Sequence, residues 1–189
     1  MFKAQRQLTA ADLPTPETRL ALLGLTIEKL IAAGYVYIGM DHFALPKDEL
    51  VVAQENGTLH RNFQGYSTRG YCDLIGLGVS SIGKVGDNFV QNLKTLPEYY
   101  GALDRGELPV HRGLTLTRDD IIRRDVIQQI MCYGVLDYDA TARRFGIDFR
   151  SYFASELVAL EPMVADGLAE FADPGLRVLL WVPPAEAYF

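Results

Sequence analysis

The residues best suited to chemistry gather in one stretch of the chain, from Gly39 to Ile82. It holds the adjacent pair Asp41 and His42, in which the carboxylate can tune the imidazole for proton transfer or orient it as a ligand. It also holds His60 and Arg61, and a guanidinium can bind a carboxylate or phosphate through two parallel hydrogen bonds. Each pair also has a non-functional interpretation. His42 could simply be hydrogen-bonded to the backbone, and His60 and Arg61 could be solvated surface residues. The residues alone leave these alternatives open.

Two further segments of this stretch are irregular. Residues 59–68 follow neither a strand period nor a helix period, and an irregular segment of this kind is more often functional than structural. Gly76 and Gly78 resemble a dinucleotide-binding glycine pattern, but the third glycine is missing, so we discard that interpretation. Residues 73–79 are otherwise apolar and predict a buried strand whose backbone is approached closely by another group. Residues 80–83 are then expected to form a tight loop.

The elements that must position these residues begin with a helix. Thr15, Pro16 and Glu17 supply an N-cap, a proline at the first helical position and an acid in the first turn. A glycine such as Gly34 is typical of the left-handed position that closes a helix. Residues 1–14, which precede the helix, are interpreted as a polar N-terminal segment. Apolar residues at spacings of three and four predict one face docked on another element: Leu20, Leu23, Ile27, Leu30 and Ile31.

Next comes a short β-branched and aromatic run, residues 35–38, which predicts a strand. This strand would deliver Asp41 and His42 at its C-terminal end, where α/β folds tend to place function. A loop is expected from there to Pro46. Residues 47–55 then predict a helix that an Asn-Gly pair stops.

The domain boundary is expected between residues 106 and 113, where apolar periodicity lapses and then resumes. This gives two domains, residues 1–108 and residues 109–189. Before the boundary, residues 88–103 predict two short helices with Pro97 between them.

The C-terminal domain is predicted to be mainly helical and winged-helix-like. A helix capped by Thr117 and closed by Gly134 should lead it. Helices over 139–145 and 150–164 and a hairpin of strands 168–171 and 176–182 should follow. The chain as a whole is therefore predicted to be α+β.

Composition narrows the function. The 189 residues carry a net charge of −6, which gives no support to a nucleic acid partner. No run of about 18 uncharged apolar residues is present, so no membrane partner is expected. The arginines near Thr117 alternate with aspartates, a pattern usual for a solvated helix face. Cys72 and Cys132 read as two buried thiols of a reducing compartment, which indicates a cytoplasmic location.

Four motifs in order carry a family resemblance: Ile-Gly-Met-Asp-His-Phe-Ala (38–44), Lys-Asp-Glu-Leu-Val-Val-Ala-Gln (47–54), Leu-His-Arg-Asn-Phe-Gln-Gly-Tyr (59–66) and Leu-Thr-Arg-Asp-Asp-Ile-Ile-Arg-Arg-Asp-Val-Ile (116–127). Together they resemble oxygen-independent coproporphyrinogen III oxidase, the radical SAM dehydrogenase of haem biosynthesis, from about residue 2 to about residue 178. The related haem chaperone-like proteins have a Tyr-Trp pair at the third of these segments. This chain has no Trp there, which favours the dehydrogenase branch.

The resemblance implies a porphyrin-pathway oxidoreductase. In that family a [4Fe–4S] cluster cleaves S-adenosylmethionine, and the resulting radical starts the oxidative decarboxylation of coproporphyrinogen III to protoporphyrinogen IX. It implies that Ile82 contacts a second S-adenosylmethionine and that Gln64 lies close to that site. His42, His60 and Arg61 are candidate partners for substrate carboxylates, by charge complementarity. No catalytic residue and no metal ligand is assigned in this chain.

Two departures from the family shape our expectations. The cluster motif Cys-x3-Cys-x2-Cys does not occur in this sequence, and its two cysteines cannot supply the three or four thiolates that an iron–sulfur cluster needs. Residues 179–189 also differ from the family's end. We therefore expect the end of a three-quarter barrel region followed by the helical domain. Such a chain could come from a truncated or frame-shifted gene, or it could work together with an upstream N-terminal radical SAM piece.

Alone, the chain is expected to be catalytically inactive. Without the barrel, the first helix would expose Leu23, Ile27 and Leu30, and we expect this apolar surface to cause association or poor solubility of the isolated chain. The alternative is a non-catalytic module that binds a porphyrin or a partner protein.

Overall fold

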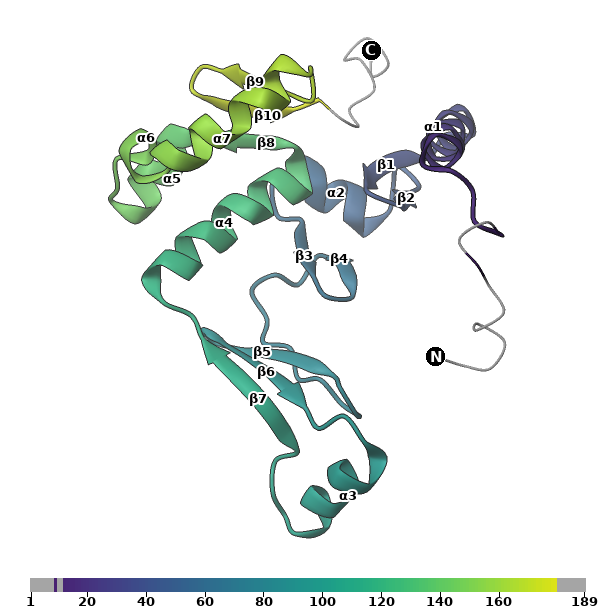
Figure 1. The fold of residues 1–189 in the computed structure, drawn as a ribbon, viewed down its shortest axis with the longest axis vertical. Coiled ribbons are helices and arrows are strands. Elements are labelled where there is room, and N and C mark those ends of the chain that lie inside the picture. Colours follow the sequence, from purple (N-terminus) through teal and green to yellow (C-terminus); the bar gives the residue numbers. More distant parts are fainter. Residues whose placement is uncertain (1–8, 10–11, 180–189) are drawn as a thin grey trace.

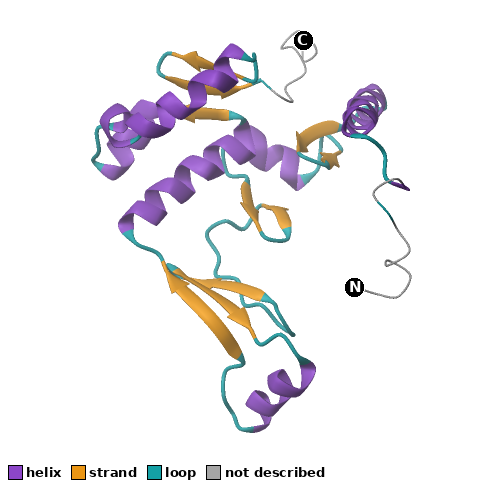
Figure 2. Cartoon of the chain, viewed as in Figure 1, coloured by secondary structure: helices purple, strands orange, loops and turns teal. Residues whose placement is uncertain are grey.

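The structure, a computed structural model, describes residue 9 and residues 12–179 (Figure 1). Most of the expected polar N-terminal segment and all of the divergent tail after Leu179 lie outside the described residues. Helices and short antiparallel strands alternate along the chain, which confirms the α+β class (Figure 2). Within this described part, no helix has both the length and the apolar character needed to cross a bilayer.

The first helix, α1 (Pro16–Ala32), begins and ends as predicted. The Thr15 side chain accepts a hydrogen bond from the Thr18 N–H, and Gly34 follows the helix with φ +87°. Its apolar residues, however, are not covered: no α1 residue is buried, and Leu20 is 60% exposed. Leu23, Ile27 and Leu30 are half-buried.

The Asp41–His42 pair lies in a tight hairpin. Strand β1 (Val36–Gly39) pairs antiparallel with β2 (His42–Ala44), so the loop expected between His42 and Pro46 is wrong. The turn is possible because Gly39 and Met40 both take positive φ, 146° and 54°. The predicted helix follows as α2 (Glu49–Glu55), which begins two residues later than predicted because the Asp48 carboxylate caps it.

A second hairpin replaces the irregular segment predicted over 59–68. Strand β3 (His60–Asn62) pairs antiparallel with β4 (Gly65–Ser67) around a two-residue turn at Phe63 and Gln64. Each strand is three residues long, which is too short for the alternation of apolar and polar side chains to show in the sequence.

A three-stranded sheet of order β5-β6-β7 extends away from the rest of the chain (Figure 1). It consists of β5 (Ile82–Val85), β6 (Asn88–Asn92) and β7 (Val110–Thr115). Two predictions fail here, because Ile82 starts a strand and not a loop, and residues 88–92 form a strand and not a helix. Strand β7 lies beyond residue 108 yet pairs with β6, so the sheet spans the expected domain boundary.

The segment before and the helix after these strands also differ from prediction. Residues 73–79 form no strand, since only an isolated bridge joins Leu74 to Lys84, and Leu77 is 83% exposed. The close backbone approach predicted at Gly76 is present, because a Cβ there would lie 2.6 Å from the Ser81 hydroxyl. Pro97 lies in the first turn of α3 (Leu96–Asp104) after the Thr95 cap and does not separate two helices.

The C-terminal part begins with α4 (Arg118–Tyr133), which has a capping box at Thr117 and a left-handed Gly134 at its end, as predicted. The predicted helix over 150–164 is divided at Phe153, and a strand that was not predicted, β8, pairs with the hairpin to give the sheet order β8-β10-β9. The elements after α4 are β8 (Val135–Asp137), α5 (Tyr138–Phe145), α6 (Phe149–Tyr152), α7 (Ala154–Ala165), β9 (Ala169–Ala172) and β10 (Gly175–Val178).

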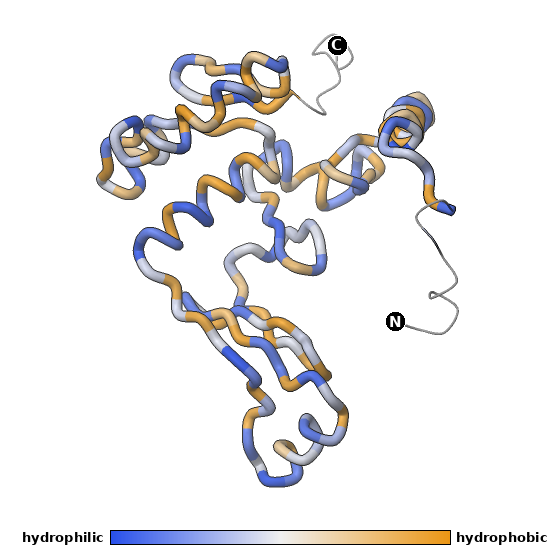
Figure 3. Tube along the Cα trace, viewed as in Figure 1, coloured by the Kyte–Doolittle hydropathy of each residue, from blue (hydrophilic) through white to orange (hydrophobic). Residues whose placement is uncertain are grey.

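Helix α4 belongs to both hydrophobic cores of the described chain. Its Ile122 lies in the C-terminal core with Leu136, Tyr138, Phe149, Phe153, Ala169 and Leu176. Its Cys132 lies in a second core with Ile38, Ala44, Val51, Ala53 and Leu59. Hydrophobic positions also occur along α1 and in the β5–β7 sheet, which contribute to neither core (Figure 3).

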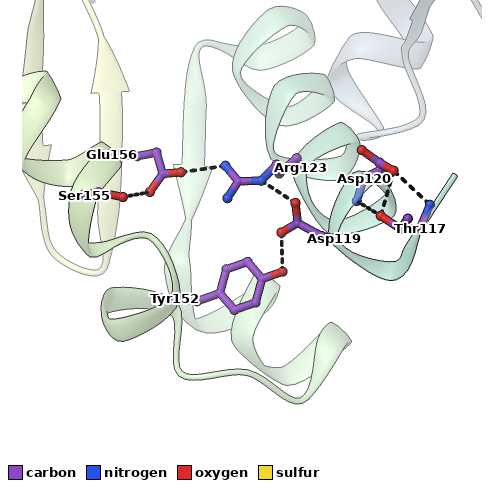
Figure 4. A network of polar contacts seen from close by, with 7 residues as sticks. All are labelled: Thr117, Asp119, Asp120, Arg123, Tyr152, Ser155 and Glu156. Carbon is purple, nitrogen blue, oxygen red and sulfur yellow. Dashed lines mark hydrogen bonds and ion pairs between the residues drawn. The ribbon is translucent and has the colours of Figure 1, made fainter.

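The charged face of α4 is an ion-pair network and not only a solvated surface (Figure 4). Arg123 lies 2.8 Å from the Asp119 carboxylate and 2.6 Å from that of Glu156 on α7, and the Tyr152 hydroxyl donates to Asp119. These contacts join α4 to α6 and α7. They lie at the surface, where single ion pairs stabilise little and a linked set stabilises more.

The free energy of unfolding should depend strongly on Ile122. It is 1% exposed, and Ile122→Ala is expected to lower the free energy of unfolding by about 2–5 kcal/mol because it opens a cavity. Ile127→Ala on the same helix is the matched control, since Ile127 is 56% exposed and the expected change is within about 0.5 kcal/mol. Equal losses in urea denaturation would contradict the assignment of the core.

The two cysteines should differ in reactivity, because Cys72 is exposed and Cys132 is buried. The prediction that both are buried is therefore wrong for Cys72. Burial also raises the pKa of the Cys132 thiol to about 11, which leaves little thiolate at neutral pH. Alkylation measured by mass spectrometry should modify Cys72 alone in the native chain and both thiols in denaturant. Equal rates in the native chain would contradict the burial of Cys132.

Candidate functional site

Tyr66 on β4 is the point where the two hairpins meet helix α4. Its hydroxyl donates a hydrogen bond to the Met131 carbonyl at 2.9 Å. A side-chain carbon at Gly39 would overlap this hydroxyl, so only glycine permits the approach of β1. The ring meets His42 edge-on at 5.1 Å, and the Arg61 guanidinium carbon lies 5.6 Å from its centroid. Desolvation by burial raises the pKa of Tyr66, so the hydroxyl stays protonated as a donor.

Gln128 fixes the β3–β4 hairpin on α4. Its amide oxygen accepts from the Arg61 N–H at 2.9 Å, and its amide nitrogen donates to the Arg61 carbonyl at 2.7 Å. The side chain thus makes the two hydrogen bonds that a neighbouring strand would make. Five residues farther along α4, the Tyr133 hydroxyl donates to the Leu59 carbonyl at 2.9 Å. His60 and Arg61 are therefore held on a rigid backbone.

The Asp41–His42 pair does make contact. His42 Nδ1 lies 2.8 Å from the Asp41 carboxylate, although within the described residues no aligned hydrogen bond reaches this nitrogen. The opposite edge of the ring faces Gly65, where a Cβ would lie 3.0 Å from Nε2. The Tyr66 ring contacts both His42 and Arg61, and His42 does not line the cleft described next.

A cleft of about 650 Å³ lies between the β3–β4 hairpin, β5 and α4. The structure brings His60 and Arg61 together there, and adds two residues that were not predicted, Lys84 from β5 and Arg124 from α4. One signal could have indicated Arg124, because it precedes Gln128 by four residues and so shares its helix face. Nothing in the sequence around Lys84 indicates its proximity.

The cleft is basic although the chain is acidic. Its lining holds His60, Arg61, Arg69, Lys84 and Arg124 against a single carboxylate, Asp73. The pKa of His60 is lowered, first by burial and then by repulsion from Lys84 and Arg124. His60 is therefore neutral at pH 7, and the positive charge of the cleft comes from the arginines and the lysine. Such a cleft attracts anions.

Ile82 and Gln64 lie outside this cleft. Gln64 is exposed in the β3–β4 turn, where its N–H donates to the Asn62 side-chain oxygen at 2.9 Å. Ile82 is half-buried at the start of β5, opposite Gln91 of β6. Phe63, which precedes Gln64 in the turn, packs edge-on against Phe89 of β6 with ring centroids 5.9 Å apart.

The described residues do not fit an iron–sulfur cluster. They include no group of three His, Cys, Asp or Glu side chains placed to hold a metal ion, and Cys72 and Cys132 stand apart, one exposed and one in a core. What the arrangement offers is positive charge and apolar surface for binding.

Comparisons with known proteins agree with the motifs. Residues 116–178 match the family model described as the HemN C-terminal domain. Over 177 residues the chain is 52% identical to oxygen-independent coproporphyrinogen III oxidase of Pseudomonas aeruginosa, a match that covers 94% of this chain and 38% of the relative. The Salmonella typhimurium enzyme of the same name is 49% identical over 178 residues, with 94% of this chain and 39% of the relative covered.

A solved structure is similar as well. Coproporphyrinogen III oxidase (HemN) from Escherichia coli, described as a radical SAM enzyme, superposes with a TM-score of 0.87 at 48% identity. The match covers 94% of this chain and 41% of that protein. The chain thus spans about two fifths of the length of the relatives it matches.

The titration of His60 tests the electrostatics of the cleft. By NMR, its midpoint should lie below the ordinary value of about 6.5. Lys84→Gln should raise the midpoint by removing one repelling charge, yet leave it below the ordinary value because burial is the larger cause. Lys94→Gln, at an exposed lysine outside the cleft, is the control and should change nothing. A midpoint at the ordinary value would show that His60 faces solvent, and a midpoint above it would show that His60 faces a carboxylate; either result would contradict the electrostatics of the cleft.

Proposed function

We propose that this chain, which is related over 94% of its length to oxygen-independent coproporphyrinogen III oxidases and carries their C-terminal domain, forms the corresponding part of such an oxidoreductase. The likeness to the Escherichia coli structure, with a TM-score of 0.87 at 48% identity, is the observation that carries the proposal. The reaction is the oxidative decarboxylation of coproporphyrinogen III to protoporphyrinogen IX.

This chain supplies binding surface and not the iron–sulfur cluster. Cluster ligation takes three or four thiolates, and the two cysteines are neither sufficient in number nor placed together. We therefore assign the cluster to an N-terminal radical SAM portion, which belongs to the part of each relative that this chain does not match. The isolated chain is expected to be inactive. The last elements of a three-quarter barrel region would then be α1 with the β1–β2 hairpin, and the exposed Leu20 would face that portion.

S-adenosylmethionine would contact Ile82 and Gln64. Ile82 offers an aliphatic side chain at the start of β5, and Gln64 offers an exposed amide in the β3–β4 turn. The exposed ring of Phe63 stands beside Gln64. An amide and an apolar surface suit a nucleoside, whose base presents a flat apolar face and polar edges.

The substrate carboxylates would be bound by Arg61 and His60, with His42 behind them. Arg61 lines the cleft, and a guanidinium can bind a carboxylate through two hydrogen bonds. His60 is neutral at pH 7 and so acts as a hydrogen-bonding group and not as a charge. His42 does not line the cleft, and its role is to position Tyr66 by ring contact.

The two-part organisation is proposed in a modified form. Strand β7 pairs with β6, which supports a division after Thr115 and not at residue 108. The family match begins at residue 116. The second part, with helices α4 to α7 and the β8-β10-β9 sheet, is winged-helix-like in its order of elements. Two free thiols support a cytoplasmic location.

A second candidate function is a non-catalytic module that binds a porphyrin. The basic cleft favours it, because the cations belong to this chain alone and need no cluster to bind carboxylates. The two candidates differ in whether an upstream radical SAM portion makes the chain active.

Complementation tests the proposed function. The portion of the Pseudomonas aeruginosa relative that precedes the match would be prepared as a separate polypeptide, reconstituted with iron and sulfide, and mixed with this chain. We expect vinyl-containing product only from the mixture, and no cluster absorption from this chain alone.

The relative's own C-terminal portion, supplied as a separate polypeptide, is the positive control. Activity with that portion and none with this chain would contradict the proposal and favour the non-catalytic module. A stable cluster on the isolated chain would refute the assignment of the cluster to the upstream portion.

A further inference from the structure

Two arginines of the cleft each bury a nitrogen without a hydrogen-bond partner in the described part of the chain. These atoms are Nε of Arg61 and Nη1 of Arg124. A buried charged donor that lacks a partner is costly, so the described chain leaves part of the charge of both guanidinium groups unpaired. Both residues line the same cleft.

Lys84 adds a third cation. Its backbone exchanges two hydrogen bonds of 2.7 Å with Leu74, which fixes its place on β5. No carboxylate among the described residues forms an ion pair with Lys84 or Arg61. Arg124 has only a distant contact, 3.8 Å from Asp87.

The other charged groups of the cleft do not neutralise these three cations. The Asp73 carboxylate accepts the Gly86 N–H at 2.8 Å and forms no ion pair among the described residues, so it offsets at most one of the three charges. The Arg69 guanidinium donates to the Tyr71 hydroxyl at 3.0 Å and adds to the positive charge. The cleft therefore holds more positive charge than the chain itself compensates, enough for two anionic groups.

The apolar part of the lining decides between kinds of anion. Phe63, Phe89, Ile127 and Met131 line the cleft beside the cations. Phe63 is 67% exposed and Ile127 is 56% exposed, so their apolar surface is available to a ligand. A sugar phosphate has no apolar body to cover such surface, whereas a tetrapyrrole with propionate arms has both a large apolar body and carboxylates.

We propose that Lys84 and Arg124, together with Arg61, bind two carboxylates of a tetrapyrrole whose apolar body lies against Phe63 and Ile127. The proposal rests on the proposed function only for the identity of the ligand as coproporphyrinogen. Lys84 and Arg124 become binding residues of the substrate, contributed by two elements that the sequence places far apart.

The test measures binding of coproporphyrin III, the air-stable oxidised form, to the 189-residue chain by fluorescence titration. Lys84→Gln and Arg124→Gln should each raise the Kd about tenfold, as expected for the loss of one charged hydrogen-bonding partner. Lys84→Arg keeps the charge and should restore binding. Lys94→Gln and Arg143→Gln, at exposed cations outside the cleft, should leave the Kd unchanged.

Two further ligands separate the possible anions. The tetramethyl ester of coproporphyrin III keeps the ring and loses the carboxylate charges, so it should bind more weakly and show no dependence on Lys84. Pyrophosphate should compete poorly. If pyrophosphate binds through Lys84 and coproporphyrin III does not bind, the cleft is a phosphate site and the proposal is overturned.

Equal affinities of the Lys84→Gln and Lys94→Gln chains for coproporphyrin III would overturn the proposal, provided that far-ultraviolet circular dichroism shows both folded. This outcome is distinguishable from failure of the proposed function. If complementation fails while binding depends on Lys84 and Arg124, the cleft stands and the non-catalytic module is the function.

Discussion

The arrangement of the whole site depends on the pair of hydrogen bonds between the Gln128 amide and the backbone of Arg61. The β3–β4 hairpin is only three residues deep on each side, and a hairpin of that size is not stable alone. Gln128 supplies the missing strand neighbour, and Tyr66 and Tyr133 add hydrogen bonds to either side of it. Helix α4 therefore sets where the cations of the hairpin stand.

Helix α4 can do this because it is anchored in two cores. Ile122 near its start and Cys132 near its end are each 1% exposed, and they belong to different clusters. The β5–β7 sheet contributes to neither core, so the cleft has one wall on a well-packed helix and one on a peripheral sheet. Lys84 of that sheet pairs with Leu74, and Phe89 packs against Phe63 of the β3–β4 turn.

The described part of the chain gathers binding groups but no set of metal ligands. Cations and apolar surface line one cleft, while no three His, Cys, Asp or Glu side chains of the described residues are placed to hold a metal ion. This division agrees with relatives that are more than twice as long as the match. The mixed charges of α4 likewise divide into two roles, since Arg123 joins helices to each other and Arg124 faces the cleft.

The sequence by itself determined the helices whose ends carry local signals, such as the Thr15 and Thr117 caps and the closing glycines Gly34 and Gly134, because a cap is satisfied within one turn. It also indicated the resemblance to oxygen-independent coproporphyrinogen III oxidases, because four motifs kept their order, and the comparison at 52% identity agrees with that resemblance. Only the tertiary structure decided the short hairpins and the strand β5. Their backbone hydrogen bonds are made with partner strands, and the strands are too short for a period of two to show in the sequence. It alone brought Lys84 and Arg124 to Arg61, because contacts between separate elements depend on packing that no local pattern records.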